Sequence, residues 1–534
     1  MAYVITQNCC KDESCIPVCP VDCIRPTATT EDRSQPQMLY IDPDTCVDCG
    51  ACEMECPVGA IYYEDDLPSG QEKYRDINAE YFARHPLVPV PSSNPSKHES
   101  VESGPLRVAV VGTGPASCYV IQELADVHGV EIDVYERLPT PFGLIRAGVA
   151  PDHQRTKAIT DMFASALAHP QLRCHLNVQI GADLMHDELM SHHHAVVYGT
   201  GAPTGRALGI PGEHLVGSAA ASDFVGWYNG HPDSSSAHFD LTTERVVIIG
   251  NGNVALDVAR VLLMDKDALR MTDIAAHALE ALSQCDVREV IIIGRRGLRD
   301  GAFSAAEFMG LGSLRGVDVV IEDDELEGHP SDEMEITLKL ECAREYAART
   351  PTEGNKRIVF RFSTSPVEVI GTDRIEGLRV ASRTSSSDEV IPTSLVLRSI
   401  GNRGSRLDGV PFDDAAGRIP NDRGRVIGED GERVIGVYAA GWAKRGATGV
   451  IGTNRACAGE TIKALWEDFD AGLFRRELPP RDAIDALLSE RDVEQIDWNG
   501  WSTIDQVERQ RGQEDSRVRV KVIDTAEMIA IARN

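Results

Sequence analysis

Short apolar runs alternate with longer helix-compatible segments throughout the chain downstream of residue 105. The clearest runs are LRVAVV at 106–111, RVVII at 245–249 and VREVIIIG at 287–294. Continuous Val/Ile-rich runs of this length, separated by helical segments, are typical of the parallel strands of βαβ units. The pattern therefore predicts an α/β architecture with parallel sheets, without any solenoid-like repeat.

Two segments lack this alternation. Between Arg84 and Pro105 the chain contains five prolines and five serines. Such a composition cannot support a helix or a paired strand for long, so we expect an interdomain linker there. From about Asp468 the sequence is polar and helix-compatible, includes Trp498 and Trp501, and has no motif that indicates a role.

Bulk properties narrow the class of protein. At 534 residues the chain is too long for one hydrophobic core, and about 150 residues per domain predicts roughly three or four units. No apolar run approaches the roughly 18 residues of a membrane-spanning helix, and the start lacks the regions of a signal peptide, so we expect a cytoplasmic protein. The net charge of −30 argues against nucleic-acid binding. Residues 1–66 hold 3 basic and 13 acidic residues, which either suits docking to a basic face or only keeps the domain solvated.

Nine of the 14 cysteines lie within residues 9–56 and define a separate module. Cys46, Cys49, Cys52 and Cys56, followed by Pro57, have the spacing that bacterial ferredoxins use for iron–sulfur ligands. A disulfide framework belongs to small secreted domains, and a zinc site fits this run less well. The run therefore predicts a cluster, with its fourth cysteine reaching across to a second cluster.

The first cysteine run has the same spacing with one ligand replaced. Cys9, Cys15 and Cys19 match the first, third and fourth cysteines of the other run, but Asp12 stands where the second cysteine belongs. Because a carboxylate is a harder and weaker ligand for this iron, either Asp12 or a water holds a labile fourth iron, or a three-iron cluster rests on Cys9, Cys15 and Cys56. By cross-over, Cys19 completes the [4Fe-4S] set of Cys46, Cys49 and Cys52, while Cys10 and Cys23 are expected to be packed thiols.

This N-terminal part resembles the two-cluster bacterial ferredoxins, particularly the seven-iron type. The resemblance extends through PVDCI at 20–24 and residues 38–66, and implies an α+β ferredoxin domain.

Two later segments have the form of dinucleotide-binding turns. The first runs from a strand into Gly112 and Gly114, and a second strand ends in Glu136, which can accept hydrogen bonds from ribose hydroxyls. Ser117 replaces the third glycine of the usual pattern and slightly loosens the contact between helix and strand. We expect this turn to bind a pyrophosphate.

The second turn contains Gly250, Gly252 and Ala255. Its partner strand ends in Arg295 and Arg296 rather than in an acid, and guanidinium groups there favour a 2′-phosphate and hence NADP(H) over NAD. A mere surface arginine pair is the alternative. The longer distance from Gly250 to Arg295 predicts an extra helix within 265–286.

Residues 106–465 resemble the adrenodoxin reductase-like ferredoxin–NADP reductases, through LPTPFGLIRAGVAPDH (138–153), GIPGE (209–213), VIIGNGNVALDVAR (247–260) and GWAKRGATGVIGTN (441–454). The resemblance implies a flavoprotein with two dinucleotide-binding domains, in which the NADP domain is inserted into the FAD domain. It implies FAD contacts at Ala116, Glu136, Leu144, Ile180, Trp442, Gly449, Val450 and Ile451. For NADP it implies Arg206, Asn253, Val254, Ala255, Leu256, Arg295, Arg296, Glu307 and Gly449.

These features together predict five segments. They are a ferredoxin domain (1–66), a linker (67–105), an FAD-binding domain (106–205 and 400–467), an NADP-binding domain (206–399) and a C-terminal extension (468–534). His153 is a candidate member of a proton network and the one catalytic candidate, although a purely structural histidine explains it as well, since hydride transfer to a flavin needs no side-chain acid.

The predicted function is that of a ferredoxin–NADP reductase with a fused ferredoxin. NADPH would give a hydride to FAD, and single electrons would pass to two iron–sulfur clusters and an external redox protein, such as a ferredoxin or a cytochrome P450 system; the reverse direction is equally permitted. A disulfide reductase would need a redox cysteine pair, yet the five downstream cysteines are isolated. An electron-input subunit of a larger complex, or a reductase whose cysteine module only senses iron or docks a partner, stays open.

Overall fold

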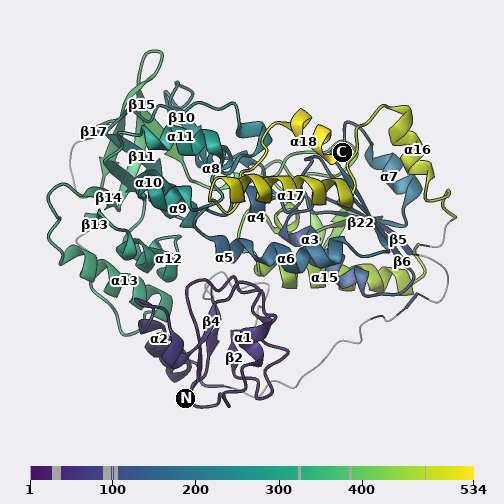
Figure 1. Cartoon of the computed structure of the whole chain (residues 1–534), viewed down its shortest axis with the longest axis horizontal. Coiled ribbons are helices and arrows are strands. Elements are labelled where there is room, and N and C mark those ends of the chain that lie inside the picture. Colours follow the sequence, from purple (N-terminus) through teal and green to yellow (C-terminus); the bar gives the residue numbers. More distant parts are fainter. Residues whose placement is uncertain are drawn as a thin grey trace.

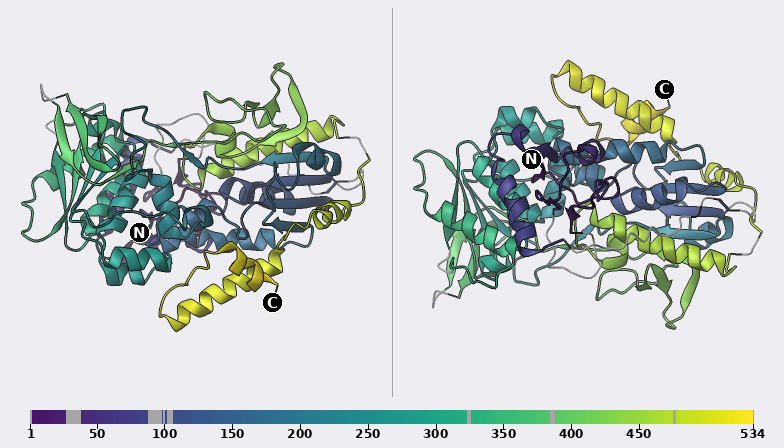
Figure 2. Two further views of the ribbon diagram at one scale, coloured as in Figure 1. Left: turned by 90° about the horizontal axis from the view of Figure 1, so that it is seen from above. Right: turned by 90° about the horizontal axis from the view of Figure 1, so that it is seen from below.

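The computed structural model of the chain describes residues 2–26, 38–87, 98, 100–101, 106–322, 326–383, 388–474 and 477–533. Two large sheets lie side by side, and the N-terminal residues lie below both of them in Figure 1. The C-terminal helices lie on a different face from the N-terminal residues, as Figure 2 shows. Within the described ranges, no helix is long and apolar enough to cross a membrane. The cytoplasmic location stays a prediction.

The first large sheet has seven strands in the spatial order β20 (Asn421–Asp422), β21 (Arg425–Ile427), β22 (Arg433–Ala439), β8 (Ala195–Tyr198), β5 (Leu106–Val111), β6 (Val130–Glu136) and β7 (Leu172–Leu176). From β22 to β7 neighbouring strands are parallel. Every residue of β5 is buried, which explains its unbroken apolar sequence. Helices α3 (Pro115–Ala125), α6 (Ile159–Leu167) and α15 (Thr453–Asp470) pack together against this sheet. We call this part the first unit.

The second unit is built on six parallel strands in the order β10 (Ser218–Ala220), β18 (Leu395–Arg398), β11 (Arg245–Ile249), β12 (Glu289–Ile293), β14 (Lys356–Arg361) and β13 (Val317–Glu322). Helices α8 (Ala221–Asn229), α9 (Asn253–Leu263), α12 (Ala305–Gly310) and α13 (Met334–Ala347) pack on one face. An antiparallel sheet of β15 (Thr364–Gly371), β16 (Ile375–Ser382) and β17 (Glu389–Pro392) packs on the other. The helix predicted within 265–286 is present as α10 (Lys266–Arg270) and α11 (Ala276–Ser283).

The chain enters and leaves the second unit through two adjacent strands, β9 (Thr204–Gly205) and β19 (Asn402–Arg403), which pair antiparallel. The first sheet therefore contains segments from before and after the second unit. This confirms the predicted fold class, in which one dinucleotide-binding domain is inserted into another. The predicted boundaries at 205/206 and 399/400 lie beside these strands, and the domain division itself stays a prediction.

The N-terminal residues form a small module of short antiparallel pairs. Strand β1 (Tyr3–Ile5) pairs with β4 (Ile61–Tyr63), and β2 (Ile24–Arg25) pairs with β3 (Tyr40–Ile41). The two cysteine loops run between these strands, and the second loop continues into the short helix α1 (Ala51–Glu55). We call residues 2–26 and 38–66 the cysteine module.

The structure differs from the predicted linker over part of its length, because Lys73–Arg84 forms helix α2. Tyr74, Ile77 and Tyr81 are buried in a cluster with the cysteine module and with α13. The amide of Asn78 accepts a hydrogen bond from the Ile41 N–H (2.9 Å) and donates one to the Ile5 carbonyl (2.9 Å). The prolines that suggested a linker begin only after this helix. Residues 88–97, 99 and 102–105 of the predicted linker lie outside the described residues.

The polar tail ends in helices α16 (Ala483–Glu490), α17 (Trp498–Glu514) and α18 (Thr525–Ala532). Residues 498–533, which we call the C-terminal segment, contact both large units. Trp501 packs edge-on against Phe142 of the first unit, with ring centroids 6.1 Å apart. Arg517 donates to the carbonyl of Ile274 in the second unit. The tail thus forms helices, as its sequence suggested, and bridges the two units.

Candidate functional site

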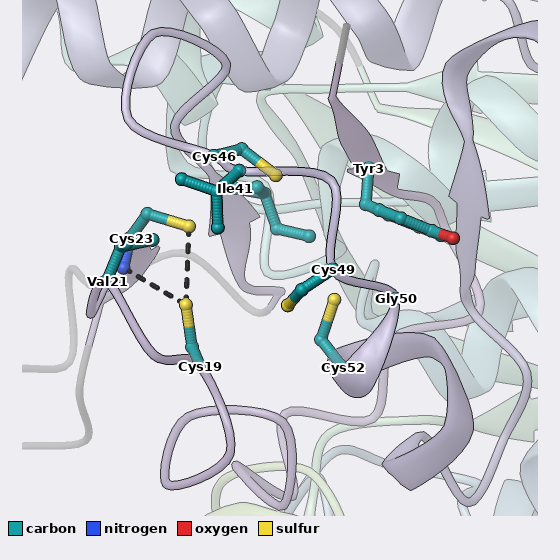
Figure 3. Close-up of a pocket in the computed structure, with 10 residues that line it drawn as sticks. Tyr3, Cys19, Val21, Cys23, Ile41, Cys46, Cys49, Gly50 and Cys52 are labelled. Atoms are coloured by element: carbon teal, nitrogen blue, oxygen red, sulfur yellow. Dashed lines mark hydrogen bonds between the residues drawn. The ribbon is translucent and has the colours of Figure 1, made fainter.

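The four cysteines that the spacing assigns to one cluster, together with Cys23, line one pocket of the cysteine module (Figure 3). Cys46, Cys49 and Cys52 come from the loop before α1 and from α1 itself, whereas Cys19 comes from the first cysteine loop. Their sulfurs point into a common space (Figure 3). The structure thus brings together the crossed-over ligands that the spacing predicts. We call these four residues the second cysteine set.

The other three cysteines of the two runs, Cys9, Cys15 and Cys56, form the first cysteine set. Burial, together with the nearby Cys9 thiol, Asp12 and Cys56, raises the pKa of Cys15. The N–H of Leu39 points at the Cys9 sulfur (3.4 Å), and the N–H of Ala60 points at the Cys56 sulfur (3.2 Å). Backbone N–H groups aimed at sulfur tune the ligands of iron–sulfur clusters. Asp12, 5% exposed, adjoins this set.

The chemistry of both sets fits a metal–sulfur centre. Burial raises the pKa of Cys9 and of Cys52 to about 12, so neither thiol ionises near neutral pH unless a cation compensates the charge. Cys10 is buried against the first unit, as a packed thiol would be. Cys23 lines the pocket of the second set, and both its sulfur and its N–H lie 3.4 Å from the Cys19 sulfur.

The turn between β5 and α3 requires glycine. Gly112 has φ 96°, and a Cβ there would lie 2.8 Å from the carbonyl oxygen of Gly199. At Gly114 an added Cβ would meet no described heavy atom within 4 Å, so the space over the start of α3 is open. The free N–H groups at a helix start bind a pyrophosphate when the backbone is this accessible.

The side chains of Glu136 and Ser117 both contact residues at this turn. Glu136 Oε2 accepts hydrogen bonds from the N–H (3.0 Å) and the hydroxyl (2.7 Å) of Thr113, and Oε1 accepts one from the Leu138 N–H (3.1 Å), which leaves Oε1 a lone pair for a ribose hydroxyl. Ser117 stands at the third glycine position, and its hydroxyl oxygen would lie 2.1 Å from a Cβ at Gly199. The absence of a side chain at Gly199 therefore accommodates the serine.

Other residues of the predicted FAD site come to this turn from distant segments. Gly441, between β22 and α14 (Trp442–Arg445), lies so close that its Cβ would be 2.4 Å from that of Ala116. The indole N–H of Trp442 donates to the Thr448 carbonyl (2.9 Å) and fixes the loop that leads to residues 449–451. Leu144 is 46% exposed at the start of α4 (Leu144–Ala147), whereas Ile180 is buried next to the ends of β5 and β6.

The second turn has the same construction. Gly250 has φ 107°, and a Cβ there would lie 2.2 Å from the Ser399 carbonyl oxygen. Gly252 precedes α9, and an added Cβ would meet no described atom within 4 Å. Arg295 and Arg296 follow the adjacent strand β12 at the same edge of the sheet. Both are exposed, and Arg296 is only loosely paired, with Asp300 at 3.4 Å.

The remaining residues of the predicted NADP site differ in which of their atoms are accessible to a ligand. The amide oxygen of Asn253 accepts from the Ser304 N–H (2.8 Å), and Val254 is 45% exposed. Ala255 and Leu256 are fully buried in the core, so only their backbone can face a ligand. Arg206 is exposed, with its Nε 3.4 Å from the Asn402 carbonyl.

A buried arginine that no sequence pattern indicates, Arg260, lies between the two units. Arg260 of α9 donates to Asp152 (2.7 Å), Asp257 (2.7 Å) and Glu307 (3.3 Å), and its guanidinium lies 2.8 Å from His153 Nε2. These acids raise the pKa of Arg260 although burial opposes them. His153, Asp257 and Glu307 lie close enough together to hold a metal ion, but the Arg260 guanidinium contacts all three. Of these contacts, only the one between Asp257 and Arg260, which are three residues apart on one helix, can be expected from the sequence.

Two family models match the chain. The 4Fe-4S binding domain matches residues 39–62, and the pyridine nucleotide-disulphide oxidoreductase matches residues 106–296. The probable ferredoxin/ferredoxin–NADP reductase of Mycobacterium tuberculosis is 44% identical over 558 aligned positions, which cover 100% of this chain and 95% of that protein. The chain belongs to this family. The predicted fusion of a ferredoxin to a flavoprotein oxidoreductase is confirmed.

Shorter relatives match the reductase part of this ferredoxin/ferredoxin–NADP reductase. The NADPH:adrenodoxin oxidoreductase of Arabidopsis thaliana mitochondria is 36% identical, over 82% of this chain and 97% of its own length. A solved structure of M. tuberculosis FprA in complex with NADPH has a TM-score of 0.76 and 40% identity, over 80% of this chain and 100% of that one. These likenesses confirm the predicted reductase fold. The open glycine turns of both units fit the dinucleotides that the family uses.

Proposed function

We propose that this reductase moves electrons between NADP(H) and an external redox protein through its own cysteine module. Bound FAD would exchange a hydride with a nicotinamide and single electrons with iron–sulfur clusters. Fusion keeps the clusters at a high effective concentration beside the flavin site. The reverse direction, which makes NADPH, uses the same sites.

The observation that carries this proposal is the position of the first cysteine set. Cys9 and Cys56 pack against the hydrophobic cluster of the first unit, which contains Ala116 and α3. All three residues of the first set also pack in the module's own core, whereas Cys19, Cys46 and Cys52 of the second set pack in that core but not against the first unit's cluster, and Cys49 is exposed. Electrons would therefore pass from the flavin site to the first set, then to the second set, and leave at the surface.

The cluster types differ in this proposal. The second set, which has four thiols, would hold a [4Fe-4S] cluster, and the first set, which has three, would rest as a [3Fe-4S] cluster. Anaerobic addition of iron should convert the latter to a four-iron form, and Asp12→Cys should make that form permanent. A wild-type protein that keeps eight irons in air would contradict this assignment.

The surface around the second set suggests the external partner. Residues 38–66 contain eight acidic and no basic residues, and Val47 and Met54 are 56% and 81% exposed. A partner with an apolar spot inside a basic rim is complementary to this surface. A ferredoxin or a cytochrome P450 system is a candidate for this external redox protein. Free cysteine ligands also agree with a cytoplasmic location.

The order of sites can be tested by anaerobic NADPH titration of the holoprotein, followed by optical and EPR spectroscopy. In wild type, flavin bleaching should be followed by cluster reduction. In Cys49→Ser the flavin should still bleach, whereas cytochrome c reduction should fall at least about tenfold. Cys285→Ser, in the second unit and outside both sets, is the matched control. Clusters that stay oxidised in wild type, or cytochrome c reduction that Cys49→Ser does not change, would refute the order.

The choice of NADP(H) can be tested at Arg295 and Arg296. Replacing both by alanine should raise the KM for NADPH by about tenfold or more, because charge-assisted contacts to the 2′-phosphate are lost. The kcat/KM for NADH should hardly change. Arg288→Ala, at the opposite end of the same strand, is the control. An equal loss with both nucleotides would assign the pair a structural role.

A further inference from the structure

Asp12, which stands where the first cysteine run lacks a cysteine, lies in a loop that directly contacts the reductase. Gly452, which precedes α15, donates its N–H to the Cys10 carbonyl (2.9 Å). A Cβ at Gly452 would lie 1.8 Å from the Lys11 carbonyl oxygen and 2.4 Å from the Asp12 nitrogen. The loop of residues 9–14 therefore rests directly on the start of α15, where only glycine leaves room for it.

Arg455, on the first turn of α15, holds the same loop from the side. Its guanidinium donates to the Asp12 carbonyl (2.9 Å) and to the Ser14 hydroxyl (3.0 Å), and lies 3.7 Å from the Asp12 carboxylate. That carboxylate accepts from the N–H (3.2 Å) and the hydroxyl (2.5 Å) of Ser14. Both oxygens of the buried Asp12 side chain are thus already engaged by Ser14 and Arg455.

The same stretch of backbone serves two sites. Residues 449–451, which the family resemblance assigns to the flavin, immediately precede Gly452, and Arg455 follows three positions later. Ile451 also packs against the hydrophobic cluster that contacts Cys9 and Cys56. Seven consecutive residues, 449–455, therefore join the flavin site to the first cysteine set.

We propose that Asp12 is a docking residue rather than an iron ligand, and that Arg455 is the positioning residue that fixes the first cysteine set against the flavin loop. At the position where the spacing calls for a cysteine, Asp12 contacts the reductase instead. With the Asp12 carboxylate engaged by Ser14 and Arg455, one contact would both hold the loop of the first cysteine set in place and slow the uptake of a fourth iron. This inference rests on the proposed three-iron state of the first set.

Iron uptake tests the inference without NADPH turnover. In the FAD-loaded holoprotein, dithionite gives one electron to the oxidised three-iron cluster, and added ferrous iron then completes it with no further electron exchanged. In Arg455→Ala the released Asp12 can ligate iron. The three-iron EPR signal that returns when timed samples are re-oxidised should therefore be lost about tenfold faster than in wild type, the ratio expected for loss of one charge-assisted hydrogen bond. Arg455→Lys should stay near wild type.

The double variant Arg455→Ala with Asp12→Asn identifies the cause, because iron uptake should return to a slow rate when the carboxylate is absent. Arg155→Ala is the matched control: Arg155 also holds the module, by donating to the Gly59 carbonyl (3.1 Å), but does not contact residues 9–14. Wild-type uptake kinetics in Arg455→Ala would overturn the inference. So would Asp12→Asn if it changed the EPR line shape of the cluster as isolated, since Asp12 would then be a ligand.

Electron transfer gives a second, separate readout. After rapid mixing with NADPH, Arg455→Ala should reduce the flavin at the wild-type rate and the clusters several-fold more slowly. If wild-type clusters are never reduced by NADPH, the proposed electron route fails while the iron-uptake result still stands. If they are reduced equally fast in both proteins, only the positioning role of Arg455 fails.

Discussion

The two ends of the chain are attached to the reductase in different ways. The cysteine module packs Cys10, Val58 and Ala60 into the cluster of the first unit, and its polar contacts with the reductase come from Arg455 and Arg155. Arg84 joins α2 to the second unit, and all three arginines remain partly or largely exposed. The C-terminal segment is held by buried ions. Glu508 has no exposed side-chain surface and binds Arg146 of the first unit, and Lys521 binds Asp273 of the second at 2.9 Å.

The difference follows from what each end has to do. A buried ion pair is costly to separate, because each partner would be left without compensation in a low-dielectric interior. Such pairs suit a segment that keeps the two nucleotide-binding units in a fixed relation. Exposed arginine contacts contribute little free energy and mainly determine orientation. They suit a module that must be aimed at the flavin site more than it must be held tightly.

Among the variants that test this comparison, loss of the Glu508 carboxylate should reduce stability the most. Its carboxylate accepts from Arg146 (2.9 Å) and Arg519 (3.0 Å), so Glu508→Ala leaves the Arg146 guanidinium without its carboxylate partner, whereas Arg519 keeps Asp505 (2.7 Å). We expect a loss of about 3–5 kcal/mol in the free energy of unfolding of the reductase units. Chemical denaturation followed by flavin fluorescence measures it. A loss below that of Arg509→Ala, an exposed arginine on the same helix, would show that the buried pair does not hold the segment.

Acid should loosen the C-terminal segment before it loosens the cysteine module. Burial by itself would raise the pKa of Glu508, but Arg146 and Arg519 outweigh it and hold the pKa below its usual value of about 4.3. Because the pKa is lower in the folded state, this stabilisation is complete above about pH 4.3 and is lost as the pH falls through the folded-state value. Proteolysis of residues 498–533 should increase in that window. Glu508→Gln should be cleaved already at neutral pH, and the same pH response in both proteins would contradict this account.

Gly452→Ala should have an intermediate effect, confined to the N-terminal attachment. The new methyl group would overlap the Lys11 carbonyl, so the loop of residues 9–14 must move, at a cost of about 1–3 kcal/mol. NADPH-dependent reduction of ferricyanide, which needs only the flavin, should persist while cytochrome c reduction falls. Gly459→Ala, where an added Cβ meets no described atom within 4 Å, is the control on the same helix. Equal loss of both activities would mean that the substitution damages the flavin site instead.

How far the sequence could predict these features depended on how local each signal is. The cysteine spacings and the glycine turns lie within short stretches, because each is formed by neighbouring residues around one ligand, and the structure brings these groups together as expected. Asp12 and Arg455 are separated by 443 positions, and Arg146 and Glu508 by 362. Such contacts leave no periodic pattern. Arg260 was missed for the same reason, since its acid partners come from three segments.

Helix α2 was missed for a different reason. Its apolar residues Tyr74, Ile77 and Tyr81 have helical spacing, but the proline-rich stretch that follows dominated the composition of the predicted linker. Asn78, between Ile77 and Tyr81, is polar and yet only 1% exposed. It is buried because its amide pairs with the edges of β1 and β3, which only the folded module provides.

The smallest expected effect is that of Arg155→Ala, which tests whether the exposed arginine contacts only orient the module. The guanidinium donates to the Gly59 carbonyl and stacks over Tyr62 at 5.5 Å, and the residue is exposed. We expect a loss below about 1 kcal/mol and an unchanged denaturation midpoint for the reductase units. Cluster reduction after mixing with NADPH should slow only slightly, because Gly452 and Arg455 still hold residues 9–14. If Arg155→Ala instead lowered the free energy of unfolding as much as Glu508→Ala does, the two ends would be attached with similar strength. The difference proposed between them would then not hold.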